Sequence, residues 1–268
     1  MFSFAAIESI READAVVVNG EGTIHHGGGL HLLAILDLAI ELGKGAFLIN
    51  ATLEEIPEYQ DVLSRLDDLV VREGYSAEYA RALGANPRVV ADSILEADFH
   101  DGVDALYNEK IVLTDCHHAR RDVYHALNLV SEIFEDDVVH FPLESLERVS
   151  DWKETLRKFR AARLVVTGRY HGVYLAAMAG TRFVALPSNS WKVPALLEAL
   201  HASNALSNCE DLISKVTEAI RYNETLEPAT SGAHPFFARP LTTMLGLRQF
   251  FGRKTWLESS RLQKESSD

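Results

Sequence analysis

Arg169 and His171 stand two residues apart and carry the chemistry that most restricts the function of this chain. A guanidinium offers a permanent positive charge and a planar set of donors that suits a carboxylate or phosphate. An imidazole titrates near neutral pH and can transfer a proton. Residues 164–167 are typical of a buried strand and 173–179 of a helix, so 168–172 form the turn between them. Because ligands bind where strands of an open α/β sheet end, this turn predicts an anion site with proton transfer.

The next predicted strand ends in a second polar turn, residues 187–192, which contains hydroxyl and amide groups and closes with a lysine. In a parallel sheet both turns lie at the same edge. On its own, His171 would be read as a polar residue at a helix start, but the second turn favours a ligand. The side chains predicted to converge on one small polyanion are Arg169, His171, Ser188, Asn189 and Lys192.

A glycine-rich turn follows the first predicted strand and is a third candidate. Glycines let the backbone approach a ligand, and the following helix N-terminus favours an anion. We predict substrate contacts at its first residues, Asn19, Gly20, Glu21 and Gly22. A dinucleotide fingerprint would need glycine at His25 and an acidic residue at Asn50, so NAD is disfavoured. The alternatives are a flexible turn and a metal site at His25 and His26, although adjacent histidines rarely bind one metal.

Arg72 ends another predicted strand, just before Gly74 and Ser76, the latter a predicted helix N-cap. One guanidinium beside a helix N-terminus suits a carboxylate or phosphate clamp. An equal alternative is a surface ion pair of Arg72 with Glu73 or an aspartate.

The strand predicted over residues 110–115 is followed by Cys116, His117 and His118. His117 is a candidate ligand-binding residue, and the plainer alternative is that both histidines are polar residues at a helix start. Cys116 fits a small buried residue better than a nucleophile.

Strand-like and helix-like segments alternate in two groups along the chain. The first group consists of residues 15–20, 30–42, 46–50, 57–66, 68–72, 76–83 and 89–92. The second consists of residues 110–115, 121–134, 138–141, 152–159, 164–167, 173–179, 182–186 and 193–201. Such alternation predicts βαβ units and parallel sheets, hence an α/β fold of two Rossmann-like lobes with a cleft between them. The predicted domains are 1–97, a linker 98–109, 110–225, and a partly helical tail 226–268, with a loop at 228–240, a helix at 241–251 and a frayed end at 258–268.

Composition excludes several functional classes. The chain has 268 residues, 47% of them hydrophobic, and a formal net charge of −13, which argues against nucleic acid as a partner. An anionic ligand must therefore be held by a few local cations. Two widely separated cysteines indicate neither disulfides nor zinc. No apolar run is long enough to span a membrane and the start lacks the basic flank of an export signal, so we expect a cytoplasmic protein.

The segment Thr167-Gly-Arg-Tyr-His-Gly172, continued to Pro187 with Lys192 just beyond, resembles the most characteristic block of the polysaccharide pyruvyl transferases. The glycine-rich start at 16–29, the block Val71-Arg-Glu-Gly-Tyr-Ser76 and the strand end at Ala91-Asp92 match that family in order, so the resemblance covers roughly residues 14–200. It implies a glycosyltransferase-B-like fold, with residues 1–97 on the acceptor side. Family members usually carry an earlier strand and an Asn-x-Gly-Asp turn, so we expect a truncated first lobe, from either a short member or a trimmed one.

The resemblance implies transfer of pyruvate from phosphoenolpyruvate onto a sugar as a ketal, in exopolysaccharide biosynthesis. Arg72 and Arg169 would hold the phosphate and carboxylate, and His171 would be the general acid. Because Arg and Lys already supply positive charge, we expect no metal and no cofactor beyond this donor. The acceptor is either free or lipid-linked, and in the latter case the protein would be peripheral at the inner face of the membrane. The sequence predicts no oligomeric state.

Three alternatives stay open. The first is a glycosyltransferase of the same architecture with a nucleotide-sugar donor, in which Arg169 and His171 would grip the diphosphate. The second is a non-catalytic partner that retains the fold in an exopolysaccharide assembly complex. The third is an NAD-dependent enzyme.

Overall fold

Parallel strands joined by helices build two separate units in the computed structural model, which divides between Leu95 and Glu96. The structure describes residues 3–22, 24–96, 102–144 and 151–225. The predicted loop at 228–240, helix at 241–251 and frayed end at 258–268 lie outside these residues.

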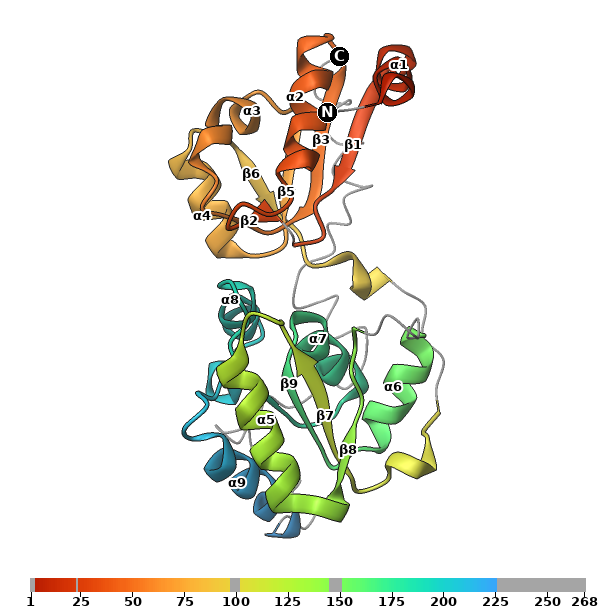
Figure 1. The fold of residues 1–268 in the computed structure, drawn as a ribbon, viewed down its shortest axis with the longest axis vertical. Coiled ribbons are helices and arrows are strands. Elements are labelled where there is room, and N and C mark those ends of the chain that lie inside the picture. The colour runs from red at the N-terminus through yellow and green to blue at the C-terminus, as the bar shows by residue number, and fades with distance from the viewer. Residues whose placement is uncertain (1–2, 23, 97–101, 145–150, 226–268) are drawn as a thin grey trace. The chain divides into compact units, whose positions relative to one another are not determined.

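The first unit is a parallel sheet in which strand order follows chain order, β1-β3-β5-β6 (Figure 1). Its strands are β1 (Ala15–Asn19), β3 (Gly45–Ala51), β5 (Asp68–Val71) and β6 (Pro87–Val89), with a small parallel pair of β2 (Ile24–His25) and β4 (Leu53–Glu54). Its helical elements are α1 (Phe4–Glu12), α2 (Leu30–Glu41), η1 (Pro57–Tyr59), α3 (Gln60–Ser64), α4 (Gly74–Ala82) and η2 (Ser93–Glu96). Because right-handed crossovers advance in one direction, α2, α3 and α4 are expected on the same face.

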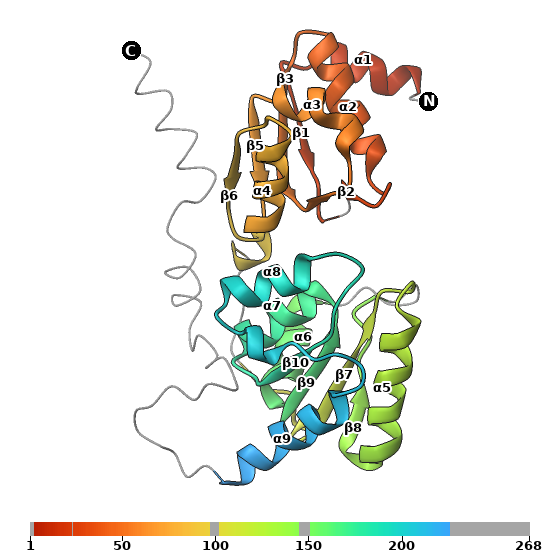
Figure 2. The ribbon, with the colours of Figure 1, turned by 90° about the vertical axis from the view of Figure 1, so that its left-hand side faces the viewer.

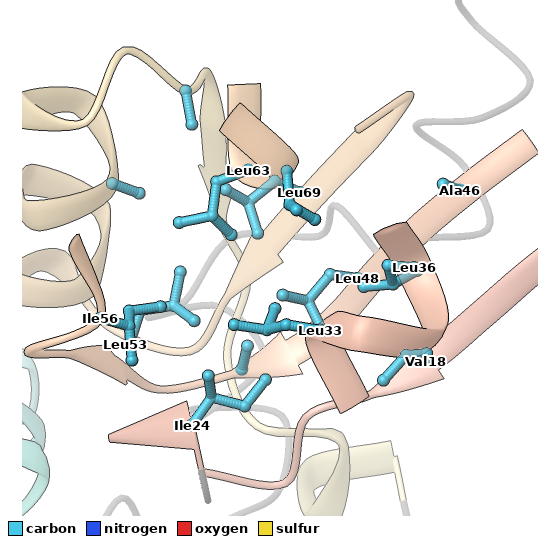
Figure 3. Packing of buried hydrophobic residues seen from close by; sticks show 14 of the residues in the cluster. Val18, Ile24, Leu33, Leu36, Ala46, Leu48, Leu53, Ile56, Leu63 and Leu69 are labelled. Carbon is cyan, nitrogen blue, oxygen red and sulfur yellow. The ribbon is translucent and has the colours of Figure 1, made fainter. Parts of the chain in front are cut away.

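The core of the first unit lies between that sheet face and the helices (Figure 3). Val18, Leu48 and Leu69 come from β1, β3 and β5 and share one apolar cluster with Leu33 and Leu36 of α2. All five side chains are almost completely buried. Their burial fixes the register of the strands, and with it the position of the strand ends.

The second unit is also parallel, but its strand order, β10-β9-β7-β8, reverses direction between β7 and β9 (Figure 2). Its strands are β7 (Ile111–Cys116), β8 (Val138–His140), β9 (Leu164–Gly168) and β10 (Phe183–Ala185). Its helical elements are η3 (Ala105–Tyr107), α5 (Arg121–Phe134), η4 (Glu135–Asp137), α6 (Trp152–Ala161), α7 (Tyr170–Ala179), α8 (Lys192–Ala199), η5 (Ser203–Ala205) and α9 (Leu212–Thr225). Ligands in such sheets bind outside the carboxyl ends of the two strands where the order reverses.

Helices cover both faces of this second sheet. Val123 and Leu127 of α5 and Val216 of α9 share one apolar cluster with Leu113 and Val166 of the sheet, and α6 and α7 lie on the other face (Figure 2). Every residue of β9 is therefore buried, which explains the apolar run at 164–166 with which the strand begins.

The predicted α/β class of two Rossmann-like units is confirmed, with local corrections. The strand β9 runs to Gly168 and α7 begins at Tyr170, so His171 lies in the first turn of a helix and not in a turn between elements. Arg169 is the N-cap residue, in an extended conformation. The N-cap of α4 is Glu73 and not Ser76, because the Glu73 carboxylate accepts the backbone N–H of Ser76 at 2.8 Å.

Some elements escaped the prediction altogether. Helices α1 and α9, the first and last helices of the described residues, lie outside the βαβ rhythm, and β2 and β4 each contribute only two residues to their pair. The β2 strand, Ile24–His25, lies inside the glycine-rich segment.

Candidate functional site

Arg169 lies where the strand order of the second unit reverses. It follows β9 directly, and its guanidinium reaches across to Asp115 near the end of β7. Arg169 Nε donates to Asp115 Oδ2 at 2.7 Å, a terminal nitrogen approaches the same oxygen at 2.5 Å, and Glu144 pairs with the guanidinium from another side. The side chain is 23% exposed. A fixed cation therefore stands at the place where this fold binds ligands.

The two carboxylates that contact Arg169 differ in how firmly they are held. Asp115 is 20% exposed, and its second oxygen accepts the backbone N–H of Leu143 at 2.8 Å. Glu144 is 70% exposed, so solvent screens its ion pair with Arg169. An incoming anion could displace Glu144 while Asp115 continues to orient the guanidinium.

The glycines that flank this block allow close packing. A Cβ on Gly168 would lie 2.6 Å from Cys116 Cβ, and one on Gly172 would lie 2.1 Å from Thr167 Oγ1. Thr167 Oγ1 in turn accepts the backbone N–H of Arg169 at 3.1 Å. Strand β9 and helix α7 can thus meet at an angle that places Arg169 and His171 at the sheet edge.

His171 lies in the first turn of α7 and is partly buried. Its ring centroid is 6.0 Å from the Trp152 ring and 5.4 Å from the Tyr170 ring. Aromatic neighbours limit how the imidazole can turn. The His171 ring lies near the N-terminus of α7, which is the positive end of the helix dipole, and follows Arg169 by two residues in the sequence.

The second polar turn is held by a residue that sequence reasoning missed. Arg120 Nη1 donates to the carbonyl oxygens of Pro187 at 3.0 Å and Ser188 at 2.8 Å. Asp122 fixes the other side of the guanidinium, accepting from Nε at 2.9 Å and Nη2 at 2.6 Å. Ser188 is buried and donates to Asn189 Oδ1 at 3.1 Å. The only signal in the sequence was an arginine immediately before a predicted helix.

His117 is affected by charges from both polar turns, Arg169 in one and Lys192 in the other. Burial is the largest cause that lowers its pKa, followed by the charges of His118, Lys192 and Arg169, against which Glu144 acts. Lys192, the first residue of α8, is therefore electrostatically coupled to the same imidazole as Arg169. His117 Nδ1 accepts the backbone N–H of Ala119 at 3.2 Å, which leaves the proton of the neutral ring on Nε2.

Cys116, predicted to be a small buried residue, is half-buried. Burial is the main cause that raises the pKa of its thiol, so the nucleophilic thiolate is disfavoured.

Arg72, in the first unit, is almost completely buried at 3% exposure. Its Nη1 donates to Asp92 Oδ2 at 2.7 Å, and its Nη2 and Nε donate to Thr52 Oγ1 at 2.9 and 3.3 Å. Of the two ion-pair partners considered, an aspartate is the one observed, Asp92, but the pair is buried and not on the surface. The glycine-rich turn packs on this guanidinium, because a Cβ on Gly22 would lie 1.8 Å from Arg72 Nη2.

The rest of that turn forms a polar cluster at the carboxyl edge of the first sheet. Asn19 Oδ1 accepts the backbone N–H of Glu21 at 3.3 Å and Asn50 Nδ2 at 3.2 Å, and Asn50 Nδ2 also lies 3.3 Å from Ser93 Oγ. Gly20 is needed because a Cβ there would lie 2.8 Å from Ala51 Cβ. Within the first unit, the structure therefore brings Arg72 together with the turn at residues 19–22.

The described ranges hold neither a metal-ligating cluster nor a helix that could span a membrane. Within them, no three His, Cys, Asp or Glu side chains gather in a group that could hold a metal ion. His26 instead pairs with Glu55 at 2.6 Å. No helix in the same ranges is long and apolar enough to cross a membrane.

Two Rossmann-like units of parallel strands, each with polar residues at its carboxyl edge, define a glycosyltransferase-B-like protein. Solved structures share this fold. A protein of Listeria monocytogenes named as a UDP-N-acetylglucosamine 2-epimerase is 15% identical with a TM-score of 0.58, covering 93% of this chain and 78% of its own. The UDP-GlcNAc 2-epimerase of Methanocaldococcus jannaschii, in complex with UDP-GlcNAc and UDP, is 15% identical with a TM-score of 0.56, covering 91% and 78%.

The family model described as polysaccharide pyruvyl transferase matches residues 2–190, which is most of the chain. The protein therefore belongs to the polysaccharide pyruvyl transferase family, a family of transferases, as its sequence motifs predicted. No curated protein sequence gives a significant match.

Proposed function

We propose that this protein transfers pyruvate from phosphoenolpyruvate to a saccharide as a ketal, in the assembly of an exopolysaccharide. The observation that carries the proposal is the position of Arg169 at the strand-order reversal, beside the polar turn that Arg120 holds. Membership of the transferase family supports it. The acceptor is a saccharide, either free or attached to a lipid.

Arg169 would bind the phosphate or carboxylate of the donor through its paired N–H donors once Glu144 moves aside. Lys192 would add a second positive charge, and the Ser188–Asn189 turn would add neutral donors. These groups stabilise the charge that develops on departing phosphate. In the first unit, Arg72 and the turn at 19–22 stay a second proposed anion-binding group, in which the ion pair with Asp92 orients the guanidinium.

His171 would protonate the methylene carbon of the enol as the first acceptor hydroxyl adds to C2. A second hydroxyl then bonds to C2, the bond from C2 to the phosphate oxygen breaks, and phosphate leaves. Of the two hydroxyl protons, one replaces the proton that His171 gave to the new methyl group, and the other leaves with phosphate. Such general acid catalysis typically contributes ~10²–10⁴-fold in rate.

The test replaces His171 with Gln and measures phosphate release from phosphoenolpyruvate in the presence of acceptor. We expect kcat to fall by about 10²-fold or more, while stabilisation of the protein by phosphoenolpyruvate in a thermal shift assay is retained. His125→Gln, an exposed histidine on α5, is the matched control. A His171→Gln enzyme within a few-fold of the parent would refute the general-acid role. Stabilisation by UDP or CMP but not by phosphoenolpyruvate would favour a nucleotide-sugar donor instead.

A further inference from the structure

A pocket of about 410 Å³ lies inside the second unit, and its lining includes Asp115, the carboxylate that pairs with Arg169. It is bounded by the end of β7, the first half of α5 and the end of β8. Its volume falls within the ~300–1,000 Å³ that small-molecule sites usually have. None of the donor-binding roles proposed above uses this space.

The walls of the pocket suit a neutral ring with polar groups at its edge. Leu113, Leu127 and Pro142 supply apolar surface, and the rings of His117 and Tyr124 stand beside them. Asn128 and Arg121 add polar groups. The pocket thus combines an apolar floor with a few placed donors and acceptors, as binding sites for small polar molecules do.

Charge argues against an anion in this pocket. Its lining includes the cation Arg121 and the carboxylate of Asp115, and the latter is already paired with Arg169. The imidazole of His117 has a lowered pKa because of its burial, so it is neutral near pH 7 and offers Nε2–H as a donor. Arg121 is solvent-exposed, which weakens its attraction for an anion.

We propose that this pocket binds one glycosyl residue of the acceptor, in the second unit and not in residues 1–97, where the family resemblance puts the acceptor. The inference rests on the proposed function. A pyranose ring presents C–H groups on its faces and hydroxyls around its edge. The faces would lie against Tyr124 and the leucines, and the hydroxyls would reach Asn128 and His117 Nε2–H. Tyr124 is 57% exposed, so its ring is available at the rim.

The pocket also lies at the right place for transfer. Asp115 lines it and at the same time accepts from Arg169 Nε at 2.7 Å. A sugar seated in the pocket would therefore adjoin the proposed donor site at Asp115, and this is the side from which its hydroxyls would have to reach C2 of phosphoenolpyruvate.

The experiment measures binding of methyl glycosides of the common hexoses by saturation-transfer NMR, using the full-length protein with phosphoenolpyruvate present. We expect at least one glycoside to bind the parent, and Tyr124→Ala and Asn128→Ala each to weaken its binding by about tenfold, as expected for loss of ~1.4 kcal/mol. Ile133→Ala is the matched control, because Ile133 is 50% exposed on the same helix and does not line the pocket. Thermal shifts with phosphoenolpyruvate should be equal in all four proteins.

Two results would overturn the inference: no glycoside binds the parent, or Tyr124→Ala and Asn128→Ala bind it as well as Ile133→Ala does. Displacement of the glycoside by uridine at lower concentration would also overturn it and identify a nucleobase pocket. Failure of the proposed function gives a different pattern. In that case glycoside binding depends on Tyr124, but phosphoenolpyruvate neither stabilises the protein nor releases phosphate.

Discussion

Replacement of Arg120 tests whether the polar turn after β10 is a binding element that must be held in place. The guanidinium makes no predicted contact with substrate, but its Nη1 donates to Pro187 O at 3.0 Å and Ser188 O at 2.8 Å. Asp122 orients it with bonds of 2.9 and 2.6 Å. Since these contacts join the start of α5 to the turn before α8, Arg120→Ala should release Ser188, Asn189 and, through them, the start of the helix at Lys192.

The size of the effect follows from the two carbonyl contacts. Hydrogen bonds from a charged group contribute about 1.5–3 kcal/mol each. The Arg120 side chain is 23% exposed, so water replaces part of what is lost, and we take about 1.5–3 kcal/mol for the pair. If the turn binds donor only in its held conformation, that free energy lowers the competent population by roughly 10-fold or more. The KM for phosphoenolpyruvate should rise by about that factor, with kcat within threefold of the parent.

The assay is steady-state phosphate release over a range of phosphoenolpyruvate concentrations, with thermal unfolding measured on the same samples. Arg120→Lys should give an intermediate KM, because one ammonium can still donate to a carbonyl, and Asp122→Asn a smaller rise because it only frees the guanidinium. A fall in Tm with an unchanged KM would refute the reasoning and leave Arg120 a purely structural residue. A fall in kcat without a change in KM would refute it as well.

Three further outcomes are expected. The folded-state pKa of His117 lies below its unfolded value, so the unfolded chain binds more protons and stability should fall as the pH drops below about 6.5; urea midpoints at pH 5.5 and 7.5 should differ less in His117→Asn than in the parent. Asp92→Asn should lower the free energy of unfolding by about 3–5 kcal/mol, since Arg72 would keep a buried charge without its carboxylate, and denaturant unfolding that shows less than 1 kcal/mol would contradict this. Glu144→Gln should lower the KM for phosphoenolpyruvate by a few-fold, because an exposed pair with Arg169 amounts to about 0.2–1 kcal/mol, whereas a raised KM would show that Glu144 helps to bind.

The fold could be predicted because the sequence patterns that indicate its strands and helices are local. Buried strands such as 164–167 appear in the sequence as short apolar runs, and helices such as 121–134 appear as amphipathic repeats. The alternation of strands and helices could therefore be predicted without knowledge of tertiary contacts. The start of α7 was misplaced because Tyr170, His171 and Gly172 look like turn residues. They become helical only because Gly172 can pack against Thr167.

The contacts of the candidate site were less predictable because they join distant parts of the chain. Arg72 and Arg169 were found from their places at strand ends, but their partners Asp92 and Asp115 depend on how neighbouring strands align. Arg120 contacts Pro187 across 67 residues, and no periodicity or spacing encodes that distance. The roles of these side chains in binding and catalysis stay predictions.

The charge balance around Arg169 limits what the site can bind. Asp115 and Glu144 together carry more negative charge than the single guanidinium they share, so the group as it stands does not attract an anion. Binding of phosphate or carboxylate becomes favourable only when Glu144 turns into solvent and Lys192 contributes its charge. Glu144 can turn into solvent at a small cost in free energy because its side chain is 70% exposed, whereas Asp115 accepts a hydrogen bond from the backbone N–H of Leu143. In the proposed mechanism, the same displacement would open the donor site while Asp115 still lines the pocket, so we expect the donor to bind before the acceptor.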